Sequence, residues 1–202
     1  LDDPSDDVAT VATELEDLRA QIAHRVVNRR LTTLSDAPDA VILGGFSSGG
    51  EVYDALNISS IGVLTEPQNW RAALEIAEQE LRRALQHGFT QAEIDEQLAN
   101  IRSALETQAA GADTRESGQI AQSIVNAYSS RDVVMDPRDQ LALFNENEDE
   151  LTAEAILAAF RDQWSDRTPQ VFISTAQEID GGSDAVLAAY EDSRATPVEP
   201  PA

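Results

Sequence analysis

The sequence predicts an α+β fold, in which a small antiparallel sheet has helices packed on one face. Most of the chain is rich in Ala and shows apolar residues at three- and four-residue steps, which is the pattern of helices. Three short β-rich runs interrupt this pattern and give the order helix, strand, strand, several helices, strand. Helices that cover one side of an antiparallel sheet are typical of this order.

The first helix is expected at residues 6–34, with Ser5 as its N-cap. Its apolar side chains form one face: Val8, Val11, Leu15, Leu18, Ile22 and Val26. Residues 40–46 and 57–65 are then predicted as a pair of strands. The turn-rich residues 47–50 lie between them, in a connecting loop of about ten residues.

A long helix should follow Pro67, started by a capping box at residues 65–68. Its stripe is Trp70, Leu74, Ala77, Leu81 and Leu85. Gly88 suits the left-handed position that ends a helix, and Thr90 with Glu93 forms a second capping box. The next helix buries Ile94, Leu98, Ile101 and Leu105. So short a link predicts that the two helices pack as a hairpin.

The rest of the chain alternates short helices with one strand. A helix from Asp113 or Thr114 should turn Ile120, Ile124 and Tyr128 inward. A short helix begins at Asp136-Pro137. Thr152 caps the next one, with Leu151 and Ile156 as a hydrophobic staple and Ile156, Phe160 and Trp164 as its buried stripe. Residues 169–175 are predicted as a strand, residues 183–191 as a helix, and the Pro-rich tail after Ala195 as linker or disordered.

Composition excludes several kinds of chemistry. The 202 residues contain no Cys, so thiolate metal sites and Cys nucleophiles are excluded. All 14 basic residues are Arg, which excludes Schiff-base lysines and P-loops. A net charge of −23 disfavours nucleic acid and anionic membranes as partners. No run approaches the ~20 apolar residues of a membrane span.

Four strings, in this order, resemble the M16 family of zinc metallopeptidases, the pitrilysin, insulysin and processing-peptidase group. They are Arg25-Val-Val-Asn-Arg-Arg-Leu31, the helix junction at 80–93, Thr114-Arg-Glu-Ser117 and Leu151-Thr152. The junction, with its Gly-Phe-Thr-x-x-Glu pattern after two arginines, is the most specific of them. Together they span about residues 6–176.

The resemblance implies repeated α+β domains arranged as a clamshell around a peptide substrate. Residues 1–176 would be the later part of one such domain, and residues 177–202 a terminal helix and Pro-rich linker. The chain begins at Leu1 without Met, so we expect it to be a piece of a longer protein. Its sheet would be completed by strands from outside the chain. The compartment is left open, and a bacterial periplasm is compatible with the resemblance.

The family's zinc site resembles His-x-x-Glu-His on the first helix, with a distant Glu as third ligand. Here His24 is followed by Val27 and Asn28 at the positions of the Glu and the second His. We therefore expect no catalytic residue, no metal ligand and no cofactor site in this chain, with zinc held by the parent protein's catalytic domain. The acids of the helix at 75–80 are expected to form a solvated face.

Other candidates receive structural interpretations. We expect His24 at the surface or as a cap, His87 as a cap of its helix end, and Arg82 and Arg83 in pairs with acids of the same helix. Trp70 and Trp164 are interpreted as core anchors, and residues 47–50 as a hairpin loop rather than an anion site. Residues 34–41 carry neither the Arg nor the Tyr with which the family's last domain contacts substrate. That role is not transferred to Tyr53.

The leading hypothesis is a non-catalytic scaffold segment of an M16-like zinc endopeptidase. The catalytic domain of the same protein and a peptide substrate would be its partners. The alternative is an inactive M16-like partner subunit that acts as a binding module. A third hypothesis, an unrelated helical adaptor, would show no sheet. Exposed sheet edges also predict a homo-oligomer at high concentration, as a result of truncation.

Overall fold

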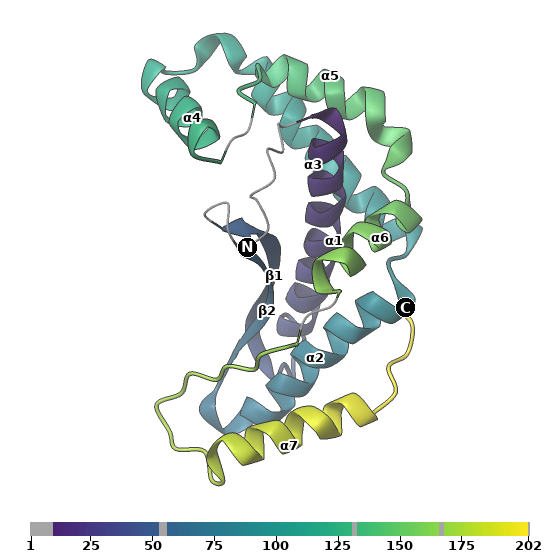
Figure 1. Cartoon of the computed structure of the whole chain (residues 1–202), viewed down its shortest axis with the longest axis vertical. Helices are drawn as coiled ribbons and strands as arrows, with labels where there is room; N and C mark the ends of the chain where they lie inside the picture. Colours follow the sequence, from purple (N-terminus) through teal and green to yellow (C-terminus); the bar gives the residue numbers. More distant parts are fainter. Residues whose placement is uncertain (1–9, 53–55, 131–132, 166–167, 202) are drawn as a thin grey trace.

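A long helix and a β-hairpin form the centre of the molecule (Figure 1). The computed structural model describes residues 10–52, 56–130, 133–165 and 168–201. Helix α1 (Val11–Ser35) begins at Thr10, whose hydroxyl accepts a hydrogen bond from the Thr13 amide. Ser5, the expected N-cap, lies outside the described residues. Of the predicted inward face of α1, Leu15, Ile22 and Val26 are buried, but Val11 was expected there and is 50% exposed. Val27 and Leu31, which the prediction did not include, are also fully buried.

Strands β1 (Ile42–Val52) and β2 (Leu56–Thr65) pair antiparallel, from Ile42 opposite Thr65 to Val52 opposite Leu56. The hairpin is longer than predicted, because residues 47–50 belong to β1 rather than to a loop. Small residues of β1 allow close packing against α1: a Cβ at Gly45 would lie 3.0 Å from Leu31 Cδ1. Helices cover one face of this sheet, which confirms the α+β prediction.

The predicted third strand is absent from the described sheet, which has two strands only. Residues 168–176 are described and run beside β2, but they form no ladder with it. The sheet's outer face is open, with Leu43, Phe46 and Leu64 more than half exposed.

Helix α2 (Trp70–His87) follows a 3₁₀ turn at Pro67–Asn69. Thr65 does not cap it, since its hydroxyl donates to the Val41 carbonyl at 2.6 Å. Gly88 ends α2 with φ 72° as predicted, although its ψ of −146° lies outside the left-handed helical region.

Helix α3 (Gln91–Ala110) starts with the predicted capping box of Thr90 and Glu93. It buries Ile94, Leu98 and Ile101 as expected, with Leu105 half-buried. The predicted hairpin of α2 and α3 is wrong: both helices pack on α1, and they diverge from their junction (Figure 1).

Helix α4 (Ser117–Ser130) follows a 3₁₀ turn at Ala112–Thr114 and stands apart from the other helices (Figure 1). Ile120 and Ile124 were expected inward but are 40% and 47% exposed. The side chain of Tyr128 lies outside the described part of the structure.

Helix α5 (Pro137–Asn147) begins at its predicted cap, Asp136, and packs on α3. It is followed by a 3₁₀ turn at Glu148–Glu150. Helix α6 (Ala153–Trp164) is capped by Thr152 as predicted. Leu151, Ile156 and Phe160 are buried in the core, and Trp164 packs against it.

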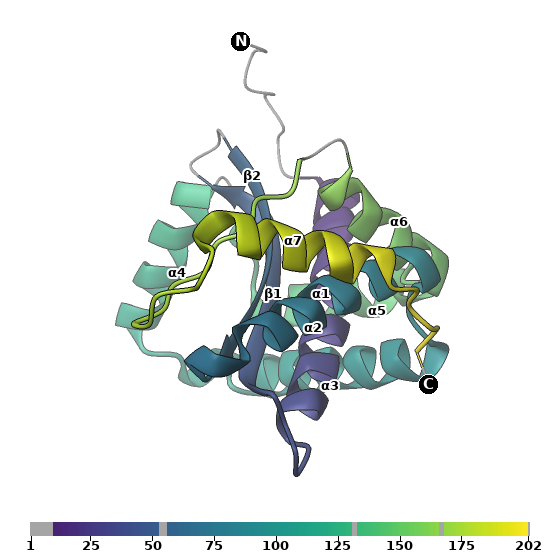
Figure 2. The same ribbon diagram turned by 90° about the horizontal axis from the view of Figure 1, so that it is seen from below.

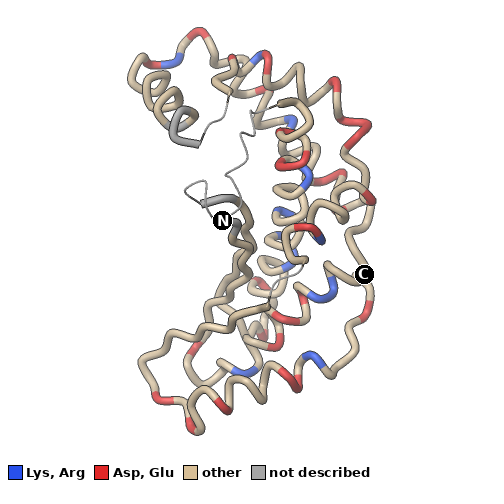
Figure 3. Tube along the Cα trace, viewed as in Figure 1, with Lys and Arg blue, Asp and Glu red and all other residues tan. Residues whose placement is uncertain are grey.

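Helix α7 (Gly182–Ala195) lies beside α2, as Figure 2 shows from below. The tail was expected to be linker or disordered, but its described residues 196–201 return along α2, and Val198 is buried. Acidic side chains are spread over the helices with arginines between them, rather than gathered in one patch (Figure 3). Among the described helices, none combines the length and apolar character needed to cross a membrane.

Candidate functional site

His24 is the centre of a buried polar cluster where α1 meets β1 and α6. It is only 5% exposed, so its expected place at the surface is wrong. Nε2 lies 2.8 Å from Gln163 Oε1, and Nδ1 lies 2.7 Å from Ser47 Oγ. Because an amide oxygen only accepts, Nε2 carries the proton and Nδ1 accepts from the Ser47 hydroxyl. Burial lowers the pKa of His24, although the bond to Gln163 works in the other direction.

Asn28 fixes the strand next to this histidine. Its amide nitrogen donates to the Ser47 carbonyl at 3.0 Å, and its amide oxygen accepts from the Ser47 backbone N–H at 2.5 Å. The side chain thus pairs with β1 as a neighbouring strand would. Val27, between the two polar residues, is fully buried in the apolar core.

Gly49 leaves the space that the cluster needs. A Cβ at this position would lie 2.4 Å from Gln163 Oε1 and 2.6 Å from His24 Nε2. Real Cβ atoms do not approach other atoms so closely. Any larger residue would therefore separate the imidazole from the amide, and this is a role for the 47–50 stretch that the loop interpretation missed.

These residues do not fit a zinc ion of the family type. Both nitrogens of His24 are used by protein partners, and both polar atoms of Asn28 are used by β1. Val27 offers no carboxylate to activate a metal-bound water. In the described part of the chain there is also no group of three or more His, Asp or Glu side chains placed to hold a metal.

The acids of α2 are not a solvated face. Glu78 and Glu80 are 8% and 5% exposed, so that expectation is wrong for both, whereas Glu75 is half-buried. Arg82 donates to both oxygens of Glu78, at 2.8 and 3.0 Å. Arg83 pairs with Glu80. The predicted pairing of both arginines with acids of their own helix is confirmed.

The same side of α2 holds the C-terminal segment. Ser193 of α7 donates to Glu78 Oε2 at 2.6 Å and is 1% exposed. Arg82 donates to the Thr196 carbonyl at 2.7 Å, and Arg83 to the Glu199 carbonyl at 2.9 Å. His87 bonds the Val198 carbonyl at 2.9 Å, so it serves the tail and not the end of its own helix.

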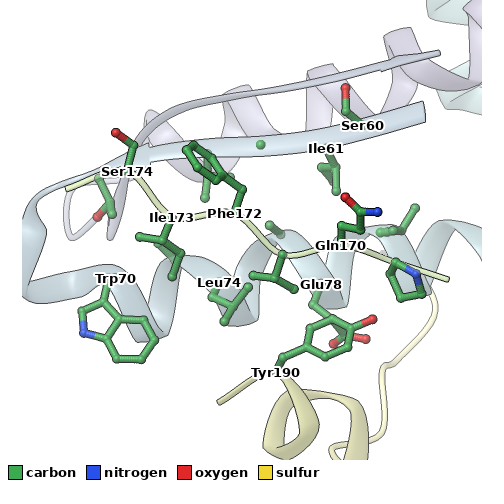
Figure 4. Close-up of a pocket in the computed structure, with 18 of the residues that line it drawn as sticks. Ser60, Ile61, Trp70, Leu74, Glu78, Gln170, Phe172, Ile173, Ser174 and Tyr190 are labelled. Atoms are coloured by element: carbon green, nitrogen blue, oxygen red, sulfur yellow. The ribbon is translucent and has the colours of Figure 1, made fainter. Parts of the chain in front are cut away.

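A hollow of about 1000 Å³ lies between β2 and α2 (Figure 4). The apolar face of α2, with Trp70, Leu74 and Leu81, forms one wall, and β2 forms another. Residues 168–176 and Tyr190 of α7 complete it. Trp70 therefore lines the hollow instead of anchoring the core.

The remaining candidates from the sequence contribute neither to the His24 cluster nor to the hollow. Residues 34–41 end α1 and lead into β1, and they line neither the cluster nor the hollow. Tyr53 lies outside the described residues. Sequence reasoning missed Gln163 and Ser193, which lie 139 and 115 residues from their partners, and no local signal marks either one.

The fold is that of part of an M16-like, or insulinase-like, protease domain. The first half of the periplasmic protease PqqL from Escherichia coli superposes with a TM-score of 0.73 at 14% identity, over 96% of this chain and 43% of that one. The whole of that protease gives 0.74 at 13% identity, over 96% and 22%. A predicted insulinase family protease from Yersinia pestis gives 0.72 at 16% identity, over 92% and 40%.

The chain thus spans less than half the length of each of these structures. At this level of identity the likeness concerns the fold. The sequence matches no protein-family profile. It matches no curated protein either.

Proposed function

We propose that the chain is a non-catalytic structural segment of an M16-like zinc metalloendopeptidase. It completes the wall of a clamshell chamber around peptide substrates and contacts the catalytic domain of the same protein. Zinc belongs to that other domain.

The side chains at positions 24–28 are the main support for this proposal. In a catalytic domain of this type, these positions of the first helix would present two imidazoles and a carboxylate to a metal. Here the one imidazole and the amide of Asn28 bind Ser47 and Gln163 inside the fold. These side chains connect the β-hairpin to α1 and α6. Their role is therefore structural, as expected of a non-catalytic segment.

Peptide cleavage and zinc content test the proposal. The pure 202-residue chain should hold no stoichiometric zinc and cleave no fluorogenic peptide. Deleting the segment from the complete gene product should abolish that protein's cleavage. Chelator-sensitive cleavage by the pure chain, lost in His24→Ala, would overturn the proposal. If the complete protein cleaves only after a separate subunit is added, the chain is instead an inactive partner subunit.

A further inference from the structure

Residues 196–201, which we call the C-terminal strap, offer a partner mainly hydrogen-bond acceptors. Pro197, Pro200 and Pro201 have no backbone N–H to donate. The N–H of Thr196 is already used at the end of α7, where it donates to the Ser193 carbonyl. Along most of its length the strap therefore presents carbonyl oxygens without matching N–H groups.

The side of α2 beneath the strap has the complementary chemistry. Arg82, Arg83 and His87 each donate to a different carbonyl of the strap, at 2.7 to 2.9 Å. A guanidinium has no acceptor, and Nε2 of His87 must carry the proton because a carbonyl oxygen only accepts. A surface of donors thus meets a segment of acceptors.

The two arginines are positioned without help from the strap. Glu78 pairs with Arg82, and Glu80 pairs with Arg83, both within α2. These buried acids stay paired whether or not the strap is in place. A surface that is already ordered loses little side-chain freedom when a segment binds to it.

Val198 anchors the strap between its exposed neighbours. Its side chain is only 7% exposed, whereas Pro197 and Glu199 are exposed. Proline also fixes the backbone angle φ, so a segment with several prolines is stiff and gives up little entropy on binding. Recognition of such extended proline-rich segments is a recurrent mode of peptide binding.

We propose that this side of α2 is a docking site for an extended proline-rich segment, and that the strap occupies it in the complete protein as well as in the 202-residue chain. The strap is then a rigid attachment instead of a flexible linker. It holds α7 on α2, with the chain leaving beside the C-terminal end of α2 (Figure 1). That it also fixes the direction of a following part of the protein rests on the proposed function.

Distances between two spin labels test the proposal. The chain contains no Cys, so Ala104→Cys in α3 and Glu199→Cys in the strap give two labelled sites, both at exposed positions. The same pair is introduced into the complete gene product, with any cysteine outside these residues replaced by Ser. Electron paramagnetic resonance should give one narrow distance distribution, with the same centre in both proteins.

Val198→Asp removes the anchor and His87→Ala removes one donor, so both should broaden the distribution. Val134→Asp is the matched control, because Val134 is 53% exposed and outside the strap, and it should leave the distribution narrow. A broad distribution in either wild-type protein overturns the proposal, as does one that neither Val198→Asp nor His87→Ala changes.

These distances do not depend on peptidase activity. A free strap in an active zinc peptidase would refute the docking site alone. A docked strap in a complete protein that cleaves no peptide would refute the proposed function alone.

Discussion

Arg30 of α1 and Glu93 of α3 form a two-fold ion pair across the junction of α2 and α3. Arg30 Nε lies 2.6 Å from Glu93 Oε1, and Nη2 lies 2.9 Å from Oε2. Nη2 also donates to the Gly88 carbonyl at 3.0 Å, and the guanidinium lies over the Phe89 ring. Burial raises the pKa of Glu93, but the bonds from Arg30 and Thr90 outweigh it and hold the pKa below its ordinary value.

This contact explains why two of the strings that carry the family resemblance occur together. The Arg-Arg string at 25–31 supplies the cation, and the junction at 80–93 supplies the carbonyl, the ring and the carboxylate. Arg30 thus links α1 to the end of α2 and to the start of α3. The two helices diverge because their short link is held against α1, and not against each other.

Replacing Arg30 by Met should cost about 3 kcal/mol of unfolding free energy, because it leaves Glu93 half-buried without its cation. The side chains of this pair are 11% and 23% exposed. Arg29→Met is the matched control, since its pair with Glu96 is 54% and 47% exposed and should be worth less than about 1 kcal/mol. Urea denaturation measures both. Equal losses would show that Arg30 has no special place at the junction.

Gly88→Ala should destabilise the chain by about 2 kcal/mol. The residue has φ 72°, which costs a side chain about 1 kcal/mol or more, and a Cβ would lie 2.9 Å from Leu157 Cδ2. The control is Gly118→Ala in α4, where nothing lies within 4 Å of the added atom. That change should be neutral or slightly stabilising. Thermal unfolding of the two variants decides, and a neutral Gly88→Ala would contradict the expectation.

His24 should make stability depend on pH. Its folded pKa is lowered, so the unfolded state binds the proton more readily. Above the unfolded-state pKa of about 6.5 the ring is neutral in both states, so it does not lower the free energy of unfolding. As the pH falls below that value, the unfolded state binds the proton first and the free energy of unfolding decreases. One proton limits the slope to about 1.4 kcal/mol per pH unit.

Unfolding free energies of wild type and His24→Gln between pH 8 and pH 5 measure this slope. The difference between the two proteins should change with pH, because glutamine does not titrate. A pH-independent difference for His24→Gln would contradict the assignment of a neutral buried ring.

Local chemistry allowed much of this fold to be predicted from the sequence. Thr90 with Glu93, Asp136 before Pro137, and Thr152 all cap the helices that the sequence indicated, because a cap depends on residues three or four positions away. The prediction of residues 47–50 as a loop was wrong, because the residues of β2 and α1 that they contact are distant in sequence. The same small residues that turn a chain also let a helix approach a strand closely.

The buried polar residues could not be predicted in the same way. From the sequence, His24 is expected at the surface and Glu78 on a solvated face. In the fold, Gln163 lies beside His24, and Ser193 and Arg82 enclose Glu78. Burial is decided by which elements meet, and the pattern along one helix does not contain that information. The free edge of β2 was inferred only in general terms, from the small number of strands.

The C-terminal segment should come away from α2 when Arg82 is removed. Arg82 holds Glu78 and donates to the Ser193 and Thr196 carbonyls, at 2.9 and 2.7 Å. In Arg82→Gln we expect faster amide exchange over residues 189–200 with little change in α3. Arg71→Gln is the control, because its 3.7 Å pair with Asp192 is exposed.

Ser193→Ala should act in the same direction. It removes a hydrogen bond to a buried carboxylate, and such a bond is worth about 1.5 to 3 kcal/mol. Exchange over 189–200 that is unchanged in both Arg82→Gln and Ser193→Ala would mean that apolar contacts alone hold α7 on α2.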